Sequence, residues 1–325
     1  MAKGLPEKKP LPGVKKIILV ASGKGGVGKT TTAGMYFIQN YNLPNYIAIS
    51  ILHVNVPTLS LCLKHVKLVY NGVIMYINNK PNIVSVNLAC AMKVIEPDKE
   101  IGLLDADVFG PSVPLMMNIS GEPMLNDENL IEPLLNYGVK CMSMGLLVSG
   151  ENAVVWRGLM VMQALERLTR HVAWGPLDCL VVDTPPGTGD THLSLAQNLP
   201  IDGAIVVTTP QSAALQVTKR GVNMFEKLKV PIVGMVENMS HAICSSCGTK
   251  NYVFGNDTQM TADQMGLEII QSFEVDQNMS ECINSGKPAI YALPDSVHAE
   301  KYRQLANKVF KYIENKENGR AKAEE

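Results

Sequence analysis

The stretch Ala21-Ser22-Gly23-Lys24-Gly25-Gly26-Val27-Gly28-Lys29-Thr30-Thr31 decides the fold of this chain, and it directly follows the apolar run Ile17-Ile18-Leu19-Val20. The spacing G-x-x-x-x-G-K-[ST] after a buried strand predicts a phosphate-binding P-loop. Glycines let successive backbone N–H groups point at one phosphate, Lys29 supplies a charge at the β- and γ-phosphates, and the Thr30 hydroxyl is a ligand for Mg²⁺. The stretch therefore predicts a site for a nucleotide phosphate with Mg²⁺ as cofactor, with an ordinary Gly-rich turn as the alternative.

A second lysine, Lys24, lies inside the same loop. A lysine there is either solvated beside the anionic site or reaches a phosphate held by a second copy of the chain, as an arginine finger does in trans. The residues alone leave both interpretations open.

Composition places the chain in the globular class and narrows the partners. Its 325 residues are 46% hydrophobic and 18% charged, with a net charge of −1. We find no basic cluster with interleaved aromatics, so nucleic acid is not expected as a partner. Seven cysteines without a secretory signal indicate a reducing compartment, where thiols are more often metal ligands or core residues than disulfides.

The composition changes abruptly over residues 34–85, which contain no Asp, Glu, Arg or Trp. One interpretation of the apolar run 46–63 is a transmembrane helix, although His53, Asn55 and Pro57 interrupt the run. An inserted β-rich excursion is a second interpretation. A translated intron is a third, because codons can be chosen that give the segment splice-like ends, and in-frame removal would join Ala33 to Val86 in a plausible helix.

Two apolar runs further along the chain end in acids. Residues 101–104 lead into Asp105-Ala106-Asp107, and residues 177–182 lead into Asp183 and the Gly-rich segment 184–190. Ligands bind open parallel sheets at the carboxyl ends of strands, so Asp107 and Asp183 are candidate site residues, with turn capping as the alternative for the first pair. The second run has the form of a Walker B strand, in which Asp183 holds a water on Mg²⁺.

A polar loop after the strand 232–236 contains Cys244-Ser245-Ser246-Cys247-Gly248. One such pair supplies two thiolates, whereas a [4Fe–4S] cluster or a structural zinc needs about four. A two-fold dimer would complete the set. A redox dithiol and a shared zinc are the competing interpretations.

The remaining pattern alternates strands and helices, which predicts an α/β fold: a doubly wound, mostly parallel sheet with helices on both faces. We expect a helix over 158–172 with Leu159, Met162 and Leu165 on its core stripe. A helix over 299–313 is expected to pack on the sheet, with a membrane surface as the alternative. The predicted organisation is an N-terminal extension over 1–13, an ATPase domain over 14–314 interrupted by 34–85, and a disordered tail over 315–325.

Several motifs together resemble one family. Residues 24–30 look like the deviant Walker A of the MinD/Mrp ATPases, and residues 102–114, 181–190 and 236–240 with the two cysteines are similar to the Mrp/ApbC iron–sulfur carriers. Residues 4–20 and 155–162 look most like the NUBPL branch, whose mitochondrial members assist assembly of respiratory complex I. The resemblance covers nearly the whole chain outside 34–85.

The resemblance implies a MinD-like (SIMIBI) P-loop fold and an ATP-sandwich homodimer. This dimer would pass a [4Fe–4S] cluster to apo iron–sulfur proteins such as complex I subunits. Weak ATP turnover is expected, because residues 34–85 interrupt the helix that supports the P-loop. Lys24 would contact the partner's nucleotide, Asp107 would orient the attacking water, and Asn238 would read adenine. Cys244 and Cys247 would share the cluster across the dimer. The nucleotide would lie on the P-loop residues Gly23, Lys24, Gly25, Gly26, Val27, Gly28, Lys29, Thr30 and Thr31.

Two rival functions remain at this stage: a MinD-like positioning ATPase that binds membranes through its C-terminal helix, and a zinc-clamped structural dimer. The expected location is the mitochondrial matrix by resemblance. The first residues show no transit peptide, so a complete N-terminus would instead indicate the cytoplasm. No stable membrane insertion is expected.

Overall fold

The structure is a computed structural model that describes residues 8–22, 82–147, 158–187, 189–244 and 246–324. The predicted P-loop and most of the segment 34–85, with its transmembrane, β-rich and intron interpretations, lie outside the described residues. Within the described part of the chain, no helix is long and apolar enough to cross a membrane.

The described strands form an eight-stranded sheet in the order β10-β7-β6-β1-β5-β2-β4-β3. All neighbouring pairs are parallel except β3 with β4. The strands are β1 (Ile17–Ser22), β2 (Ile101–Asp105), β3 (Leu134–Asn136), β4 (Val139–Ser143), β5 (Cys179–Asp183), β6 (Gly203–Thr208), β7 (Ile232–Glu237) and β10 (Ile269–Ser272). A separate hairpin pairs β8 (Ala242–Ile243) with β9 (Lys250–Asn251).

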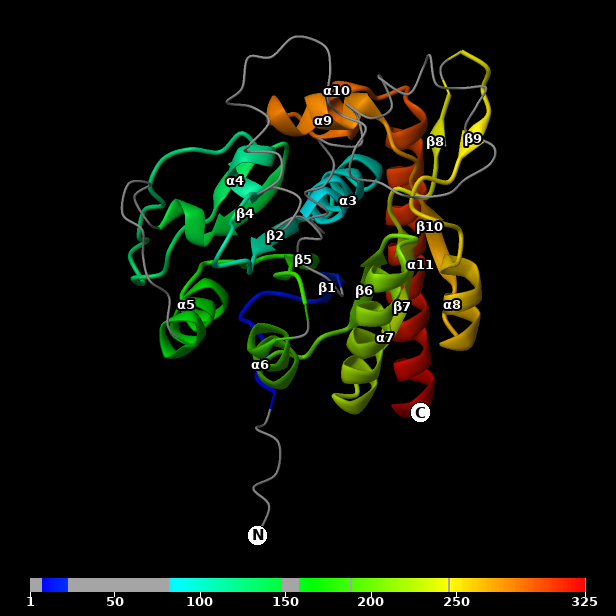
Figure 1. Cartoon of the computed structure of the whole chain (residues 1–325). Coiled ribbons are helices and arrows are strands. Elements are labelled where there is room, and N and C mark those ends of the chain that lie inside the picture. The colour runs from blue at the N-terminus through cyan, green and yellow to red at the C-terminus, as the bar shows by residue number, and fades with distance from the viewer. Residues whose placement is uncertain (1–7, 23–81, 148–157, 188, 245, 325) are drawn as a thin grey trace.

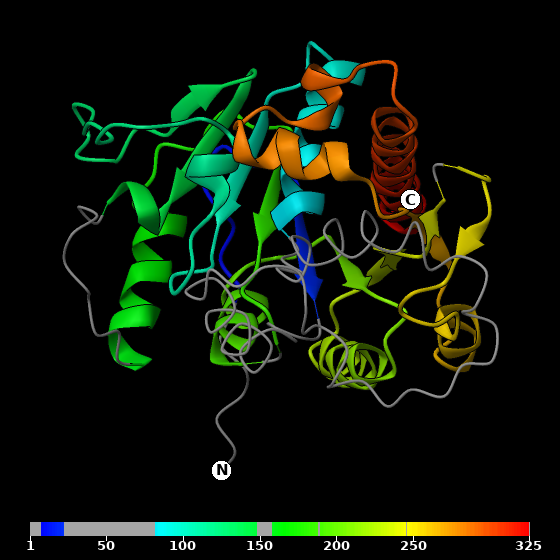
Figure 2. The ribbon, with the colours of Figure 1, turned by 45° about the horizontal axis from the view of Figure 1, so that its top comes forward.

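Helices cover both faces of this sheet (Figures 1 and 2). Residues alternate along β1: Ile18 and Val20 belong to one buried cluster, Ile17 and Leu19 to the other. The first cluster lies under α3 (Asn82–Ile95), α4 (Val113–Met116), α9 (Gln277–Asn284), α10 (Ala289–Ala292) and α11 (Val297–Glu324). The second lies under α5 (Gly158–Arg170), α6 (Asp190–Asn198) and α7 (Ser212–Lys227). The predicted doubly wound fold is confirmed.

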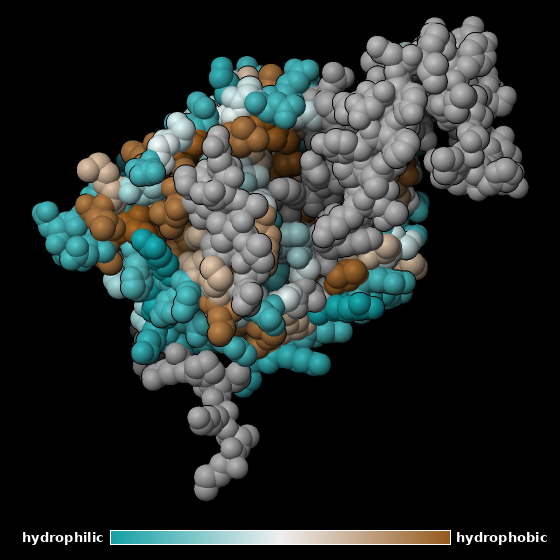
Figure 3. Space-filling view, turned by 60° about the vertical axis from the view of Figure 1, so that its left-hand side comes forward, coloured by the Kyte–Doolittle hydropathy of each residue, from teal (hydrophilic) through white to brown (hydrophobic). Residues whose placement is uncertain are grey.

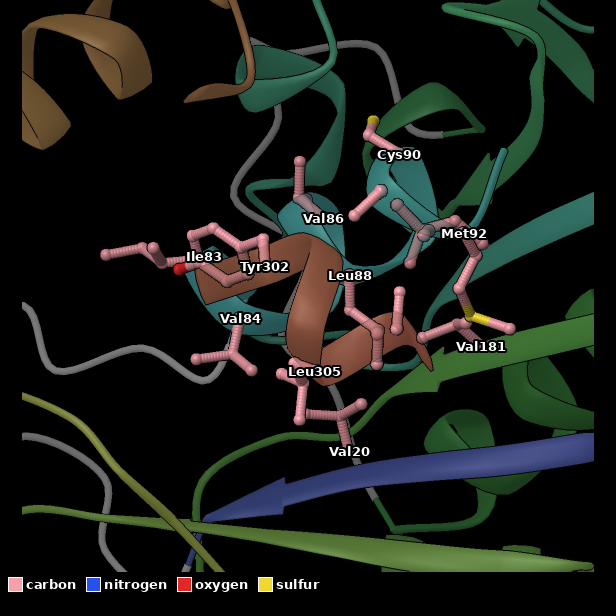
Figure 4. Close-up of a cluster of buried hydrophobic side chains, with 14 of the residues drawn as sticks. Val20, Ile83, Val84, Val86, Leu88, Cys90, Met92, Val181, Tyr302 and Leu305 are labelled. Atoms are coloured by element: carbon pink, nitrogen blue, oxygen red, sulfur yellow. The ribbon is translucent and has the colours of Figure 1, made fainter. Parts of the chain in front are cut away.

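Helix α3 is the crossover between β1 and β2, because it is the described helix between these strands and they lie on either side of β5. Figure 4 shows α3 beside α11, with Val84 and Leu88 pointing toward Leu305 of α11 and Val20 of β1, and with Val86 on the opposite side of the helix. All of these residues, with Tyr302 of α11, belong to the first buried cluster. All of these side chains are almost completely buried. The last residues of the segment 34–85 thus form the first turn of a buried helix.

Two expectations about helices differ from the structure. Leu159 is 82% exposed, and the buried side of α5 is formed by Val161, Ala164, Leu165 and Leu168. Leu159 lies six positions before Leu165, which at 100° per residue is about 240° around the helix and off the buried face. Instead of a disordered tail from residue 315, α11 continues to Glu324.

The helical course of the tail has a physical reason. It is rich in Glu, Lys, Arg and Ala, which have high helix propensity. Its beginning is also anchored to the sheet, since Lys316 Nζ donates to the Asp202 carbonyl at 2.6 Å and Glu317 pairs with Lys16 at 2.9 Å. The predicted packing of the C-terminal helix on the core is confirmed by the buried Tyr302, Leu305 and Val309.

Candidate functional site

The carboxyl ends of the central strands bring two predicted acids to one edge of the sheet. Parallel pairing puts Asp105 of β2 in register with Asp183 of β5, and Asp183 in register with Val20 of β1, two residues before β1 ends at Ser22. Ligands bind at this edge in open α/β sheets, where the strand order reverses about the first strand. The P-loop leaves β1 at the same edge. Residues 23–31, with Lys24, Lys29 and Thr30, lie outside the described residues.

Asp183 is fully buried at this edge and accepts a hydrogen bond from a residue that sequence reasoning missed. Ser85, in the first turn of α3, donates its hydroxyl to Asp183 Oδ1 at 2.8 Å. Carboxylate and hydroxyl oxygens are the hard ligands that Mg²⁺ takes, directly or through its waters. The donor chemistry of Asp183 with Ser85 therefore fits the predicted magnesium ion. The signal for Ser85 was hidden, because its sequence neighbourhood reads as part of the atypical segment.

Asp107 is 5% exposed and follows β2 on a loop that its neighbour Asp105 organises. The Asp105 carboxylate accepts from the backbone N–H of Asp107 at 3.1 Å, and Asp107 Oδ1 accepts from Gly110 N at 3.2 Å. Burial raises the pKa of Asp105 to about 6, against the opposing effect of its hydrogen bonds from Val113 N, Asp107 N and the Ser143 hydroxyl. The sequence indicated both carboxylates but gave a role only to Asp107.

A buried histidine connects the Gly-rich segment to β1. His192 of α6 is 1% exposed, and its Nε2 lies 2.9 Å from Thr184 Oγ1. The Thr184 hydroxyl also donates to the Val20 carbonyl at 3.0 Å, so it accepts from an Nε2–H and His192 carries its proton on Nε2. Burial lowers the pKa of His192 to about 4, which keeps the ring neutral. No motif pointed to this residue.

Asn238 lies at the same edge, directly after β7. Its backbone N–H donates to the Thr208 carbonyl at the end of β6 (2.8 Å), and its side-chain Oδ1 accepts from Met239 N at 3.1 Å. Met239 has φ 57°, a left-handed conformation that is costly for a residue with a side chain. The turn after β7 is thus held in a strained shape that keeps Asn238 at the sheet edge with 8% of its surface exposed.

The two predicted thiols lie in the turn between β8 and β9, in the hairpin that is separate from the main sheet. The turn is closed by Gly248 N donating to the Cys244 carbonyl at 2.8 Å and Cys244 N donating to the Thr249 carbonyl at 3.0 Å. Cys247 is exposed and Cys244 is partly exposed. The Cys247 Sγ and Thr249 Oγ1 atoms lie 3.3 Å apart. Hydrogen bonds from Thr249, and then from Cys244, lower the pKa of Cys247.

The other described cysteines are buried: Cys90, Cys141, Cys179 and Cys282. Burial raises the pKa of each, so they are unsuited to bind metal as thiolates. Among the residues that the structure describes, no group of three or more His, Cys, Asp or Glu could hold a metal ion. The described part of one chain therefore presents two accessible thiols, one of them with a lowered pKa, which is half the number that a four-thiolate site needs.

Comparisons with known proteins agree with this arrangement. The ParA family model described as "NUBPL iron-transfer P-loop NTPase" matches residues 81–310. A mouse protein named iron-sulfur cluster transfer protein NUBPL is 41% identical over 314 residues, covering 96% of this chain and 82% of its own. An Arabidopsis protein named iron-sulfur protein required for NADH dehydrogenase, mitochondrial, is 42% identical and is covered over 80% of its length, against 93% of this chain.

Solved structures show the same architecture. A nucleotide-binding protein from Archaeoglobus fulgidus, solved in complex with ADP, aligns with a TM-score of 0.57 at 28% identity, over 84% of this chain and 87% of that one. The cell-division ATPase MinD of Pyrococcus furiosus aligns with a TM-score of 0.58 at 17% identity, over 91% and 98%, and shows the fold alone. From the sheet-edge acids, the thiol pair and these matches, we conclude that the chain belongs to the ParA/Mrp family, among the NUBPL-type iron-transfer P-loop NTPases.

Proposed function

We propose that this chain is an ATP-dependent iron–sulfur cluster carrier that holds a [4Fe–4S] cluster between two copies and passes it to apoproteins. The observation that carries the proposal is the exposed pair Cys244 and Cys247, since the described part of one chain offers no further accessible thiol. A surface cluster held by four thiolates from two chains is accessible to a recipient. The relatives named as cluster transfer proteins, and the one named as required for NADH dehydrogenase, make complex I subunits the proposed recipients and the mitochondrial matrix the proposed location.

The nucleotide half of the mechanism uses the sheet edge. We assign ATP to the loop 23–31, with Lys29 on the β- and γ-phosphates and Lys24 on the partner's nucleotide. Asn238 reads adenine from the end of β7, and Asp107 orients the attacking water. Bound Mg²⁺ supplies charge neutralisation at the phosphates. Asp183 would hold this ion through a water, and the Ser85 hydroxyl fixes one oxygen of the Asp183 carboxylate.

An exposed apolar surface supports the homodimer. Phe109 is 66% exposed two residues from Asp107, and Leu115 of α4 is 62% exposed. Figure 3 shows apolar side chains gathered on the side of the molecule that carries α4 and α5. Large apolar side chains beside a site are typical of surfaces that a partner covers. A second copy there would lie next to the nucleotide edge and would couple hydrolysis to cluster release.

The MinD-like alternative needs a lipid-binding helix. In this structure the apolar face of α11 is buried against α3 and β10, where Tyr302, Leu305 and Val309 are at most 1% exposed. The cluster-carrier function is therefore the better supported of the two.

The experiment is anaerobic reconstitution of the full chain, followed by iron, zinc and acid-labile sulfide analysis. About two irons and two sulfides per chain in a dimer are expected, because one four-iron cluster is shared by two chains. Cys244→Ser should lose both, whereas Cys282→Ala, which removes a buried thiol, should retain them. Zinc without sulfide would instead establish the structural dimer, and metal-free protein would refute the carrier function. For the nucleotide site, Lys29→Ala should abolish ATP binding and Asp107→Ala should bind ATP without hydrolysing it.

A further inference from the structure

The Asp105 carboxylate is surrounded by hydrogen-bond donors. It is fully buried at the end of β2. Its Oδ1 accepts from Asp107 N at 3.1 Å. Its Oδ2 accepts from Ser112 N at 3.1 Å, Val113 N at 3.2 Å and Ser143 Oγ at 3.0 Å. A buried carboxylate with four donors is an organising centre, because the buried N–H groups of Asp107 and Val113 lose their acceptor without it.

Three of the four donors belong to one short loop. Residues 106–113 leave β2 and return to the same carboxylate at the start of α4, so Asp105 closes this loop at both ends. The fourth donor, Ser143, joins the loop to the end of β4, and its hydroxyl oxygen accepts from Gly145 N at 3.1 Å.

The turn after β4 also packs against the loop. A Cβ at Gly145 would lie 3.2 Å from Pro111 Cγ and 3.4 Å from Pro114 Cγ, so the glycine permits a close approach of the two segments. The loop is thus held by the Asp105 carboxylate and by this turn, and Asp107 lies within the loop.

We propose that Asp105 is a positioning residue for ATP hydrolysis, which fixes the backbone of the loop 106–113 and thereby determines where the Asp107 carboxylate lies. The inference rests on the proposed function, in which Asp107 orients the attacking water. Asp105 itself takes no part in the chemistry.

Replacing Asp105 with asparagine can test the positioning of Asp107 without disrupting the rest of the loop. The amide has nearly the same shape but only one acceptor oxygen. If that oxygen faces Ser112, Val113 and Ser143, their three hydrogen bonds are retained and the amide NH₂ meets the Asp107 N–H. The opposite orientation leaves two backbone N–H groups facing an NH₂. The first orientation costs less, because it keeps three of the four hydrogen bonds. It removes only the hydrogen bond from Asp107 N.

The test compares three variants of the full chain by ATP turnover and by ADP affinity from calorimetry. In Asp105→Asn we expect kcat to fall about tenfold or more, with the Kd for ADP within about threefold of wild type, because small displacements of a catalytic group affect the transition state more than binding. Ser143→Ala leaves the Asp107 hydrogen bond in place and should lower kcat less. The matched control is Asp178→Asn, since Asp178 also accepts from a lysine and a backbone N–H, but at the start of β5.

A second readout does not depend on hydrolysis. Amide hydrogen exchange in Asp105→Asn should become about tenfold faster at Asp107, with smaller changes at Ser112 and Val113, while Asp178→Asn leaves these amides as in wild type. If wild type fails to hydrolyse ATP, the proposed function is refuted and amide exchange still decides whether Asp105 fixes Asp107. Wild-type exchange at Asp107 in the variant, or wild-type kcat, would overturn the inference.

Discussion

The buried His192 makes a quantitative prediction about stability and pH. Its ring is 1% exposed, Nε2 bonds to Thr184, and Nδ1 has no hydrogen-bond partner within the described residues. A proton on Nδ1 would therefore be buried without an acceptor. Burial lowers the pKa from an ordinary 6.5 to about 4 in the folded chain. The folded state binds this proton more weakly than the unfolded state does.

The sign of the effect follows by linkage. The stability that the neutral ring contributes is fully present above pH 6.5, and it is lost as the pH falls through the window from 6.5 to about 4. The difference of about 2.5 pKa units corresponds to about 3 kcal/mol in total, of which about 2 kcal/mol is lost between pH 7 and pH 4.5. That loss is a sizeable part of a typical domain stability of about 5–15 kcal/mol.

The assay is urea unfolding of wild type and His192→Gln at several pH values between 7 and 4.5. Glutamine can donate to Thr184 from a similar position and has no proton to gain, so the variant should lack this pH dependence. Its free energy of unfolding, relative to wild type, should rise by about 2 kcal/mol as the pH falls over this range. The comparison uses the difference in unfolding free energy between variant and wild type because Asp105 also titrates in this range. The pKa of Asp105 is raised to about 6, so its contribution to stability falls as the pH rises from about 4 to 6, which is the opposite direction.

The control is His171→Gln, which removes an exposed histidine just beyond α5 and so separates the loss of any imidazole from the loss of a buried one. A constant difference between His192→Gln and wild type across the range would refute the reasoning. It would mean that the folded chain accommodates the protonated ring as well as water does.

Three further predictions concern other parts of the molecule. Leu165→Ala on the buried side of α5 should cost about 2–5 kcal/mol of unfolding free energy by urea denaturation, whereas Leu159→Ala, at an 82% exposed position, should stay within about 0.5 kcal/mol of wild type. Ser85→Ala should weaken the Mg²⁺ dependence of nucleotide binding, and Ser85→Thr should restore it; equal Mg²⁺ titrations for all three chains would contradict the assigned hydrogen bond. Thr249→Val should move the pH midpoint of Cys247 alkylation upward, measured by peptide mass spectrometry, because the Thr249 hydrogen bond that lowers this pKa is lost.

Strands were predictable because their signal is local. The apolar runs that end in Asp105 and Asp183 needed only their own residues to indicate buried parallel strands, and the acid at each end placed it at the ligand-binding edge. Thiol exposure was predictable for the same reason, since Cys244 and Cys247 lie in a polar turn.

What escaped prediction depends on contacts between distant residues. The hydrogen bond from Ser85 to Asp183 joins residues 98 positions apart, and that from Ser143 to Asp105 joins residues 38 apart. The exposure of Leu159 depends on which side of α5 meets the sheet, and spacing alone does not distinguish a stripe through Leu159 from one through Val161. The helical tail depends on anchoring to Asp202 and Lys16, far from it in the sequence.

The position of the hairpin β8-β9, which carries Cys244 and Cys247, bears on whether binding at these thiols is reversible. Within the described residues, none between 243 and 253 belongs to either buried hydrophobic cluster. In a zinc finger, by contrast, the metal is part of the folding free energy and its removal unfolds the domain. A cluster bound at Cys244 and Cys247, as proposed, would therefore leave without disturbing the sheet or its helices, and the empty chain would stay folded for reloading.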